Sequence, residues 1–122
     1  MEFTGKQLTA MLKMGLAMVE ADGIVSEEEK IALTIELMKF GVTPDQLEIL
    51  LPAAHAMSAE ESLIIAAGMN PQQKKYVTGY LAMIMACDGV DDSEVKLWSV
   101  LSHLCGFPTM TIAQALDFWK NN

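Results

Sequence analysis

The sequence has little of what nucleic-acid-binding and disulfide-stabilised proteins rely on. Its 122 residues include two cysteines, two histidines and eight basic residues, against sixteen acidic ones. Aromatic residues make up only 7% of the chain, and the net charge is −8. Because an acidic protein is repelled by phosphate groups, we expect no direct binding to nucleic acid or to an anionic membrane surface.

The first residues do not resemble a leader sequence, and the sequence contains no long apolar run. Residues 1–6 have neither the basic start nor the apolar segment of a signal peptide. The longest uncharged apolar-rich stretch, 76–87, is too short to span a bilayer. We therefore expect a cytoplasmic protein without a membrane span. Cys87 and Cys105 should stay reduced there, and their spacing fits no zinc site.

Helix starts and helix ends are clearly marked. Six Ser, Thr or Asp residues have Glu or Gln three positions later, which is the capping-box pattern. They are Thr4, Ser26, Thr43, Ser58, Asp91 and Thr111. Pro44 and Pro71 fit first helical turns, and Gly41, Gly68 and Gly106 fit helix ends.

These signals, and apolar residues at helical spacing, predict an all-α fold of about seven helices. The predicted helices cover residues 5–21, 27–40, 44–56, 59–69, 71–87, 92–105 and 111–120. No low-complexity linker divides the chain, so residues 1–122 should form a single domain. The helices over 5–21 and 71–87 should form its centre, with Leu16 and Ile84 in the core.

Two stretches of the sequence look alike, which indicates an internal duplication. Residues 15–29 and 81–94 each contain an apolar segment, an Asp-Gly pair, a short turn and a capping pattern. The second loop is one residue shorter than the first. The repeats would extend over about 5–41 and 71–106. Two such helix–loop–helix halves should bury their apolar faces on each other in a compact bundle.

These stretches carry a family resemblance. Ala21-Asp22-Gly23 with the cap that follows it, the similar loop after residue 87, and the intervening segments 59–62 and 70–72 together resemble the TerB-like domain. That family is named for a tellurite-resistance protein. The resemblance covers nearly the whole chain. It implies a seven-helix fold and an association with responses to metals and other stresses.

Acidic residues are concentrated in the two Asp-Gly loops and the turns after them. Two interpretations stay open. The loops could bind a divalent cation, since hard cations prefer carboxylate oxygens. Alternatively, the acids form turns, cap helices and complement helix dipoles, and this interpretation is favoured. The candidate ligands are Asp22, Glu29, Asp88 and Glu94, with Asp91 and Asp92 as additional ones.

The remaining reactive side chains indicate no catalytic site. His55 and His103 are far apart in sequence and are expected to be structural. The many methionines are expected to pack the core. Trp98 and Trp119 could be core or rim residues. Without a nucleophile, base or cofactor motif in view, we expect a protein that is not an enzyme.

The leading hypothesis is a non-enzymatic TerB-like domain that binds a partner protein, with a divalent cation as a candidate ligand of the acidic loops. One alternative is a metal-dependent enzyme that uses the same carboxylates. Another is a purely structural or dimerisation domain. The partner is not identified by the sequence, and a homo-oligomer is left open.

Overall fold

The computed structural model describes residues 2–20, 27–86 and 92–122, and for residues 27–30 the backbone alone. Within these ranges it contains seven α-helices, one short 3-10 helix and no strand. The elements are α1 (Gly5–Val19), α2 (Glu27–Leu37), η1 (Met38–Phe40), α3 (Pro44–Ala56), α4 (Ala59–Ala67), α5 (Pro71–Ala86), α6 (Asp92–Cys105) and α7 (Ile112–Asn121). The predicted all-α fold is confirmed.

The helix ends differ slightly from the predicted ones. The segment predicted as one helix over 27–40 tightens after Leu37 into η1. It ends at Gly41, whose φ of 83° lies in the left-handed region that glycine adopts without strain. α4 ends at Ala67, where the N–H of Gly68 caps the last carbonyls. The final turn of a helix is commonly tightened in this way.

Side-chain caps fix the helix starts. Thr4, Thr43 and Thr111 each accept a hydrogen bond from the backbone N–H three residues later, and the Gln at that position bonds back. Ser58 likewise accepts a hydrogen bond from the backbone N–H three residues later. Each cap satisfies backbone N–H groups that a helix start leaves without a partner. The predicted caps Ser26 and Asp91 lie outside the described residues.

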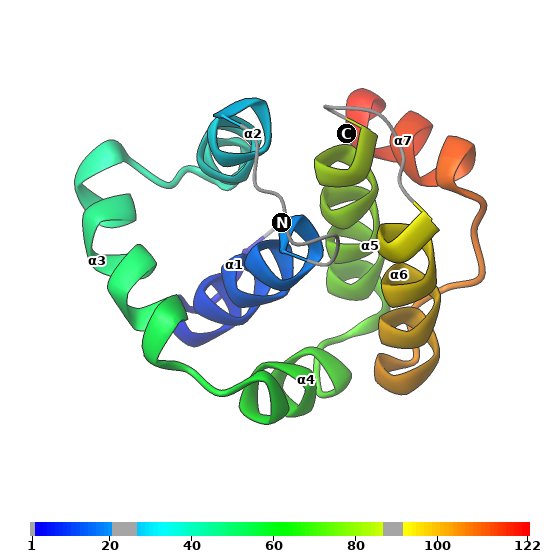
Figure 1. The fold of residues 1–122 in the computed structure, drawn as a ribbon, viewed down its shortest axis with the longest axis horizontal. Helices are drawn as coiled ribbons and strands as arrows, with labels where there is room; N and C mark the ends of the chain where they lie inside the picture. Colours follow the sequence, from blue (N-terminus) through cyan, green and yellow to red (C-terminus); the bar gives the residue numbers. More distant parts are fainter. Residues whose placement is uncertain (1, 21–26, 87–91) are drawn as a thin grey trace.

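The two long helices form the centre of the bundle, as predicted. α1 packs against α2, α3, α4, α5 and α6, while α5 packs against α1, α2, α6 and α7. Figure 1 shows α2, α3 and α4 arranged around α1, with α5, α6 and α7 together on the other side. Ile84 on α5 is fully buried, as predicted. Leu16 on α1 is only partly buried, contrary to its predicted place in the core.

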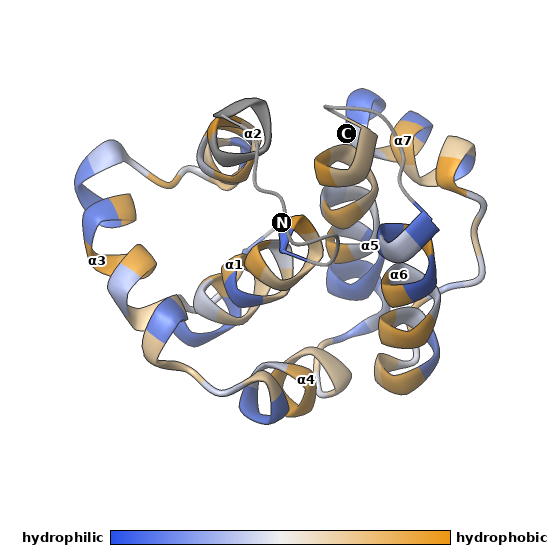
Figure 2. Ribbon diagram, viewed as in Figure 1, coloured by the Kyte–Doolittle hydropathy of each residue, from blue (hydrophilic) through white to orange (hydrophobic). Residues whose placement is uncertain are grey.

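Figure 2 shows hydrophobic and hydrophilic residues interspersed along the helices. Within the described residues, no single helix is long and apolar enough to cross a membrane. α3 and α4 together reach the required length and composition, but they meet at an angle of 111°.

Glycine lets α5 and α7 approach closely. A Cβ on Gly79 would lie 3.2 Å from the carbonyl oxygen of Ala115 and 3.1 Å from Cβ of Trp119. Trp119 can therefore lie directly against the α5 backbone, where it is almost completely buried. Its ring contacts Phe40 of η1 edge-on at a centroid distance of 5.3 Å, and Tyr80 of α5 at 5.8 Å. α7 thus packs against η1, at the end of the first half of the chain.

Polar contacts strengthen the same junction. The indole N–H of Trp119 donates to Glu36 Oε2 at 2.7 Å, and the ammonium of Lys39 donates to the carbonyl of Trp119. The hydroxyl of Tyr80 donates to the carbonyl of Leu33 at 3.2 Å. Burial raises the pKa of Tyr80 well above its usual range, and the nearby Glu36 carboxylate raises it further.

Candidate functional site

The predicted cation ligands lie mostly beyond what the structure describes. Asp22, Asp88 and Asp91 lie outside the described residues, and Glu29 is described by its backbone alone, on α2. Asp92 and Glu94 lie together in the first turn of α6. Among the described residues, no group of three His, Cys, Asp or Glu side chains could hold a metal ion.

The two described acids have different surroundings. Asp92 is exposed, whereas Glu94 has only 3% of its surface exposed. Glu94 is the third residue of α6, where backbone N–H groups and the helix dipole favour a negative charge. This position agrees with the capping interpretation of that glutamate. A role as a cation ligand stays a prediction.

The other titratable candidates lie apart from one another. His55 on α3 and His103 on α6 are both exposed. Cys105 is buried and free, and its thiol donates to the carbonyl of Leu63 at 3.8 Å. Burial raises the pKa of the Cys105 thiol, although the Lys74 ammonium lowers it. The thiol is therefore mostly protonated at neutral pH and a poor nucleophile.

A groove of about 470 Å³ opens between α1, α2 and α3. We call it the α1–α3 groove. Its walls are apolar and come from Leu16 and Val19 of α1, Leu33 of α2 and Leu51 of α3. This groove explains the partial burial of Leu16, since the side chain forms part of a surface recess. Glu20, Thr34 and His55 supply the polar groups of the lining.

The groove can hold apolar side chains next to a negative charge. Leu33 and Val19 are buried and form a fixed floor, whereas Leu16 and Leu51 are partly exposed. Glu20 follows directly on the last residue of α1, and its side chain is exposed. A recess of this size with few polar groups is typical of a binding site for an apolar ligand or side chain.

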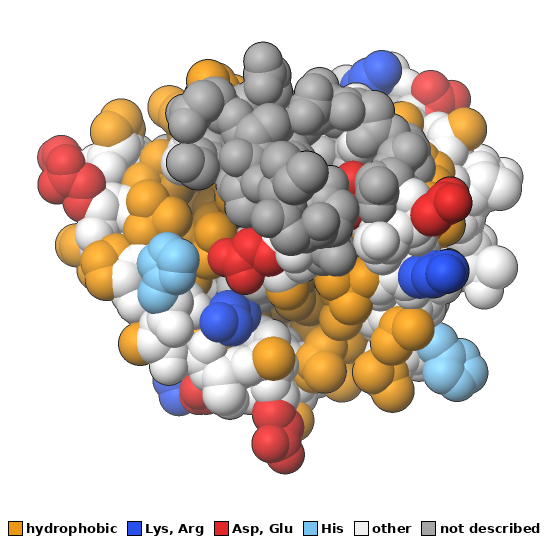
Figure 3. Space-filling view, in the orientation of Figure 1, with side chains coloured by type: hydrophobic (Ala, Val, Ile, Leu, Met, Phe, Trp, Pro, Cys, Tyr) orange, Lys and Arg blue, Asp and Glu red, His pale blue; other side chains and the backbone are white. Residues whose placement is uncertain are grey.

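Other large apolar side chains are exposed outside the groove. Figure 3 shows hydrophobic side chains gathered over α4 and α6 on the face in view. Among the residues with described side chains, the exposed large apolar ones are Ile31, Ile35, Met38, Ile49, Ile64, Val100 and Leu104. None of them lines the α1–α3 groove. Ile49, with 72% of its surface exposed, lies on α3 near Leu51 and serves below as a control position.

The chain is similar over its whole length to a solved structure, the crystal structure of the protein of unknown function PG1108 from Porphyromonas gingivalis W83. The two sequences are 43% identical, and the alignment covers 100% of this chain and 99% of that chain, with a TM-score of 0.90. This chain belongs to the same family as PG1108. No family model matches the chain, and no curated protein matches it.

The similarity to PG1108 supports the all-α fold. The resemblance to the TerB-like domain and the internal duplication both stay predictions. The structure does give the two halves one common feature, because Gly41 and Gly106 both end their helices with positive φ, at 83° and 68°.

Sequence reasoning missed the α1–α3 groove and one helix cap. The groove depends on how three helices pack, and no local pattern encodes it. The cap was readable from the sequence. Asn70 accepts a bond from the N–H of Gln73 at 2.8 Å, and Gln73 bonds back to the N–H of Asn70. An Asn followed three residues later by Gln is the same pattern that marked the other helix starts.

Proposed function

We propose that this chain is a non-enzymatic, TerB-like protein-interaction domain of the cytoplasm, which binds a basic amphipathic helix of a partner protein in the α1–α3 groove. The observation that carries the proposal is the apolar recess of about 470 Å³ with Glu20 beside it.

The shape of the groove favours a helix as its occupant. Its apolar walls come from three helices, and such grooves accept the apolar face of an amphipathic helix. Side chains of a partner at positions four residues apart could contact Leu16 and Leu51 together. Burial of these two partly exposed leucines would supply apolar area to the complex.

Charge favours a basic partner. The chain carries a net charge of −8, and the groove is lined by the carboxylate of Glu20 but by no lysine or arginine among its described lining residues. Lysine or arginine on the flanks of the partner helix would approach Glu20 as the apolar face enters. Such complementarity speeds association and selects against acidic partners.

The experiment uses the full chain as bait for a cell extract, followed by calorimetry with the purified captured partner. Leu51→Asp puts a charge into the groove wall, and we expect it to weaken binding at least about tenfold, as the loss of a central apolar contact does. Ile49→Asp makes the same change on the same helix outside the groove, and binding should stay within about twofold of the parent.

Glu20→Lys tests the charge argument. It should lower the association rate and weaken the dependence of that rate on salt. The groove proposal would be wrong if Leu51→Asp, with an unchanged melting temperature, kept the partner, or if Ile49→Asp lost it to the same extent. A captured second copy of this chain would instead identify a homo-oligomer, which sedimentation of the purified protein would detect.

The proposal includes a divalent cation at the acidic loops, with Asp22 and Asp88 as its first ligands. Titration of Ca²⁺, Mg²⁺, Mn²⁺ and Zn²⁺ should raise the melting temperature saturably in the parent protein. The Asp22→Asn/Asp88→Asn variant should lose this rise. An equal rise in the variant, or none in the parent, would leave turn formation and helix capping as the full role of these acids.

A further inference from the structure

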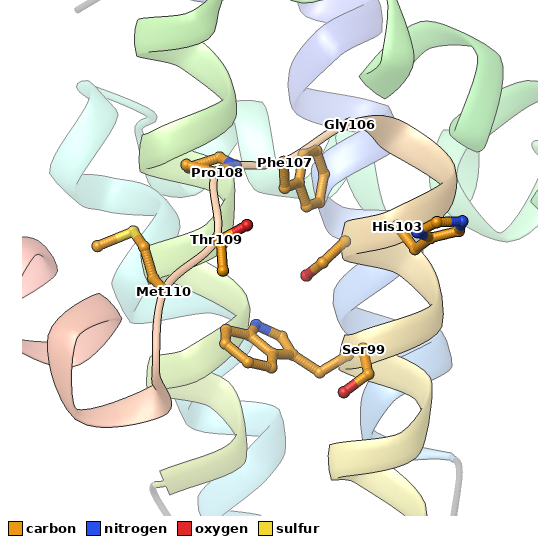
Figure 4. A pocket seen from close by; sticks show the side chains of 9 residues that line it. Ser99, His103, Gly106, Phe107, Pro108, Thr109 and Met110 are labelled. Atoms are coloured by element: carbon orange, nitrogen blue, oxygen red, sulfur yellow. The ribbon is translucent and has the colours of Figure 1, made fainter.

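A second pocket, of about 400 Å³, lies between α6 and the segment that leads into α7. We call it the α6 pocket. Figure 4 shows Phe107, Pro108, Thr109 and Met110 of the connecting segment beside the helix that carries Ser99 and His103, with the His103 ring pointing away from Pro108, Thr109 and Met110. It shares no lining residue with the α1–α3 groove.

Two buried polar atoms belong to residues that line this pocket. The indole nitrogen of Trp98 and the hydroxyl oxygen of Ser102 have no hydrogen-bond partner within the described part of the chain. Trp98 itself is only 8% exposed. A buried donor without an acceptor destabilises the folded state, so such groups are rare unless something binds them. Trp98 and Ser102 are four residues apart on one helix, so their side chains lie on the same face.

The corresponding places in the other half of the chain carry no polar side chain. Trp98 and Ser102 stand eight and four residues before the left-handed glycine Gly106. The residues eight and four before Gly41 are Leu33 and Leu37, both buried in the core. Leucine side chains at these two positions therefore fill the space at the end of such a helix. The polar pair beside the α6 pocket is not explained by packing alone.

We propose that the α6 pocket binds a small neutral molecule through a carbonyl oxygen, which accepts hydrogen bonds from Trp98 Nε1 and Ser102 Oγ. An indole N–H can only donate, so the ligand must offer an acceptor. A carbonyl oxygen has two lone pairs and can accept from both groups. The apolar body of the ligand would lie against Phe107, Pro108 and Met110.

A neutral ligand fits better than a carboxylate. No Lys, Arg, Asp or Glu is among the described residues that line the α6 pocket. The chain as a whole is strongly acidic. The ammonium of Lys74 lies beside the backbone of Gly106, and a charged analogue of the ligand tests whether it attracts an anion. Because both polar atoms are buried, binding requires side chains of the pocket lining to move, and Met110 is a flexible member of that lining.

The test is a titration of the full ¹⁵N-labelled chain with benzamide, followed by NMR. The chain has two tryptophans, so two indole N–H signals are expected, and Trp98→Phe removes and thereby assigns one of them. Trp119 is the internal control, since its indole N–H already donates to Glu36. We expect the Trp98 indole proton to shift downfield in a saturable way while that of Trp119 stays in place.

Three comparisons complete the experiment. Toluene, which lacks an acceptor, and benzoate, which is charged, should each bind at least about tenfold more weakly than benzamide. Ser102→Ala should weaken benzamide binding by about tenfold, and its melting temperature should match or exceed that of the parent. The proposal is overturned if the Trp98 signal does not shift saturably, if toluene or benzoate binds as tightly as benzamide, or if Ser102→Ala binds as the parent does.

Discussion

The helix ends before Gly41 and Gly106 resemble each other in the backbone and differ in what they enclose. Both glycines have positive φ and stop a helix. Before Gly41 the inward positions are the leucines Leu33 and Leu37, and α3 begins at Pro44. Before Gly106 they are Trp98 and Ser102, and the chain runs on to Ile112 before α7 begins.

The difference shows that a helix stop does not decide whether apolar or polar side chains border the space beside it. After Gly41, two residues lead directly into the next helix, so the leucines are covered by neighbouring helices. After Gly106, five residues without helical structure form a wall opposite α6. The first end therefore places Leu37 in the core and Leu33 on the apolar floor of the α1–α3 groove, whereas the second end places polar groups beside the α6 pocket. Substitutions at matched positions can test this contrast.

The largest loss of stability is expected when Leu37 of the first end is replaced by serine, the residue at the matched position of the second end. Leu37→Ser removes a fully buried side chain and leaves a hydroxyl in the core. We expect a loss of about 3–5 kcal/mol in the free energy of unfolding, measured with urea. Ser102→Ala, the matched change at the second end, should cost less than about 0.5 kcal/mol or stabilise the protein. Equal losses would abolish the contrast between the two ends.

The next largest loss of stability is expected at an indole group that has a hydrogen-bond partner, compared with one that has none among the described residues. Glu36→Ala takes the acceptor away from the buried Trp119 N–H, and we expect a loss of about 1–3 kcal/mol in unfolding experiments. Trp98→Phe removes an indole N–H that has no partner among the described residues, and stability should fall by less than in Glu36→Ala. A larger loss in Trp98→Phe would mean that its N–H is already satisfied in the free protein.

The two glycines should respond alike. Gly41→Ala and Gly106→Ala each force an L-residue into the left-handed region, at a cost of about 1–2 kcal/mol. The new Cβ at position 106 would contact only the end of the flexible Lys74 side chain, so this contact adds little to the loss of stability. Thermal melts of both variants should agree closely. A clearly larger loss at either position would show that the backbone similarity of the two ends does not extend to their energetics.

The smallest effect is a pH dependence that arises from Tyr80, beside the first end. The pKa of Tyr80 is raised in the folded protein by burial and by Glu36, whereas an unfolded tyrosine has a pKa of about 10. The folded state thus holds this proton more tightly. Its stabilising contribution is complete below pH ~10 and is lost as the pH rises above that value.

Tyr80→Phe provides the control for this pH dependence. It should unfold at a higher pH than the parent, relative to its own stability at pH 8, when alkaline unfolding is followed by circular dichroism. If the parent and Tyr80→Phe show the same alkaline profile, ionisation of Tyr80 does not contribute to unfolding.

The sequence predicted the helix starts well because they are encoded locally. Thr4, Thr43 and Thr111 each bond to a residue three positions away, so the pattern and the structure are the same short-range interaction. Burial was harder to predict. Leu16 belongs to an apolar stripe, and its partial exposure depends on how α2 and α3 pack beside α1.

The candidate sites show the same limit. Trp98 and Trp119 could not be told apart in the sequence, because the partner that distinguishes Trp119 is Glu36, on another helix 83 residues away. The α6 pocket depends on the path of residues 106–110, for which no sequence pattern gives coordinates. The acidic loops were the strongest sequence signal, and three of their proposed ligands, Asp22, Asp88 and Asp91, lie outside the described residues.

The contact of Trp119 with Glu36, Lys39 and Phe40 has a consequence for synthesis on the ribosome. A growing chain emerges from its N-terminus, so the first half of this domain leaves the ribosome before α7 has been made. Until then the surfaces of η1 and α5 that Trp119 covers stay open to water or to other proteins. We therefore expect the domain to complete its fold only after α7 has left the ribosome, when this helix can close against residues translated about eighty positions earlier.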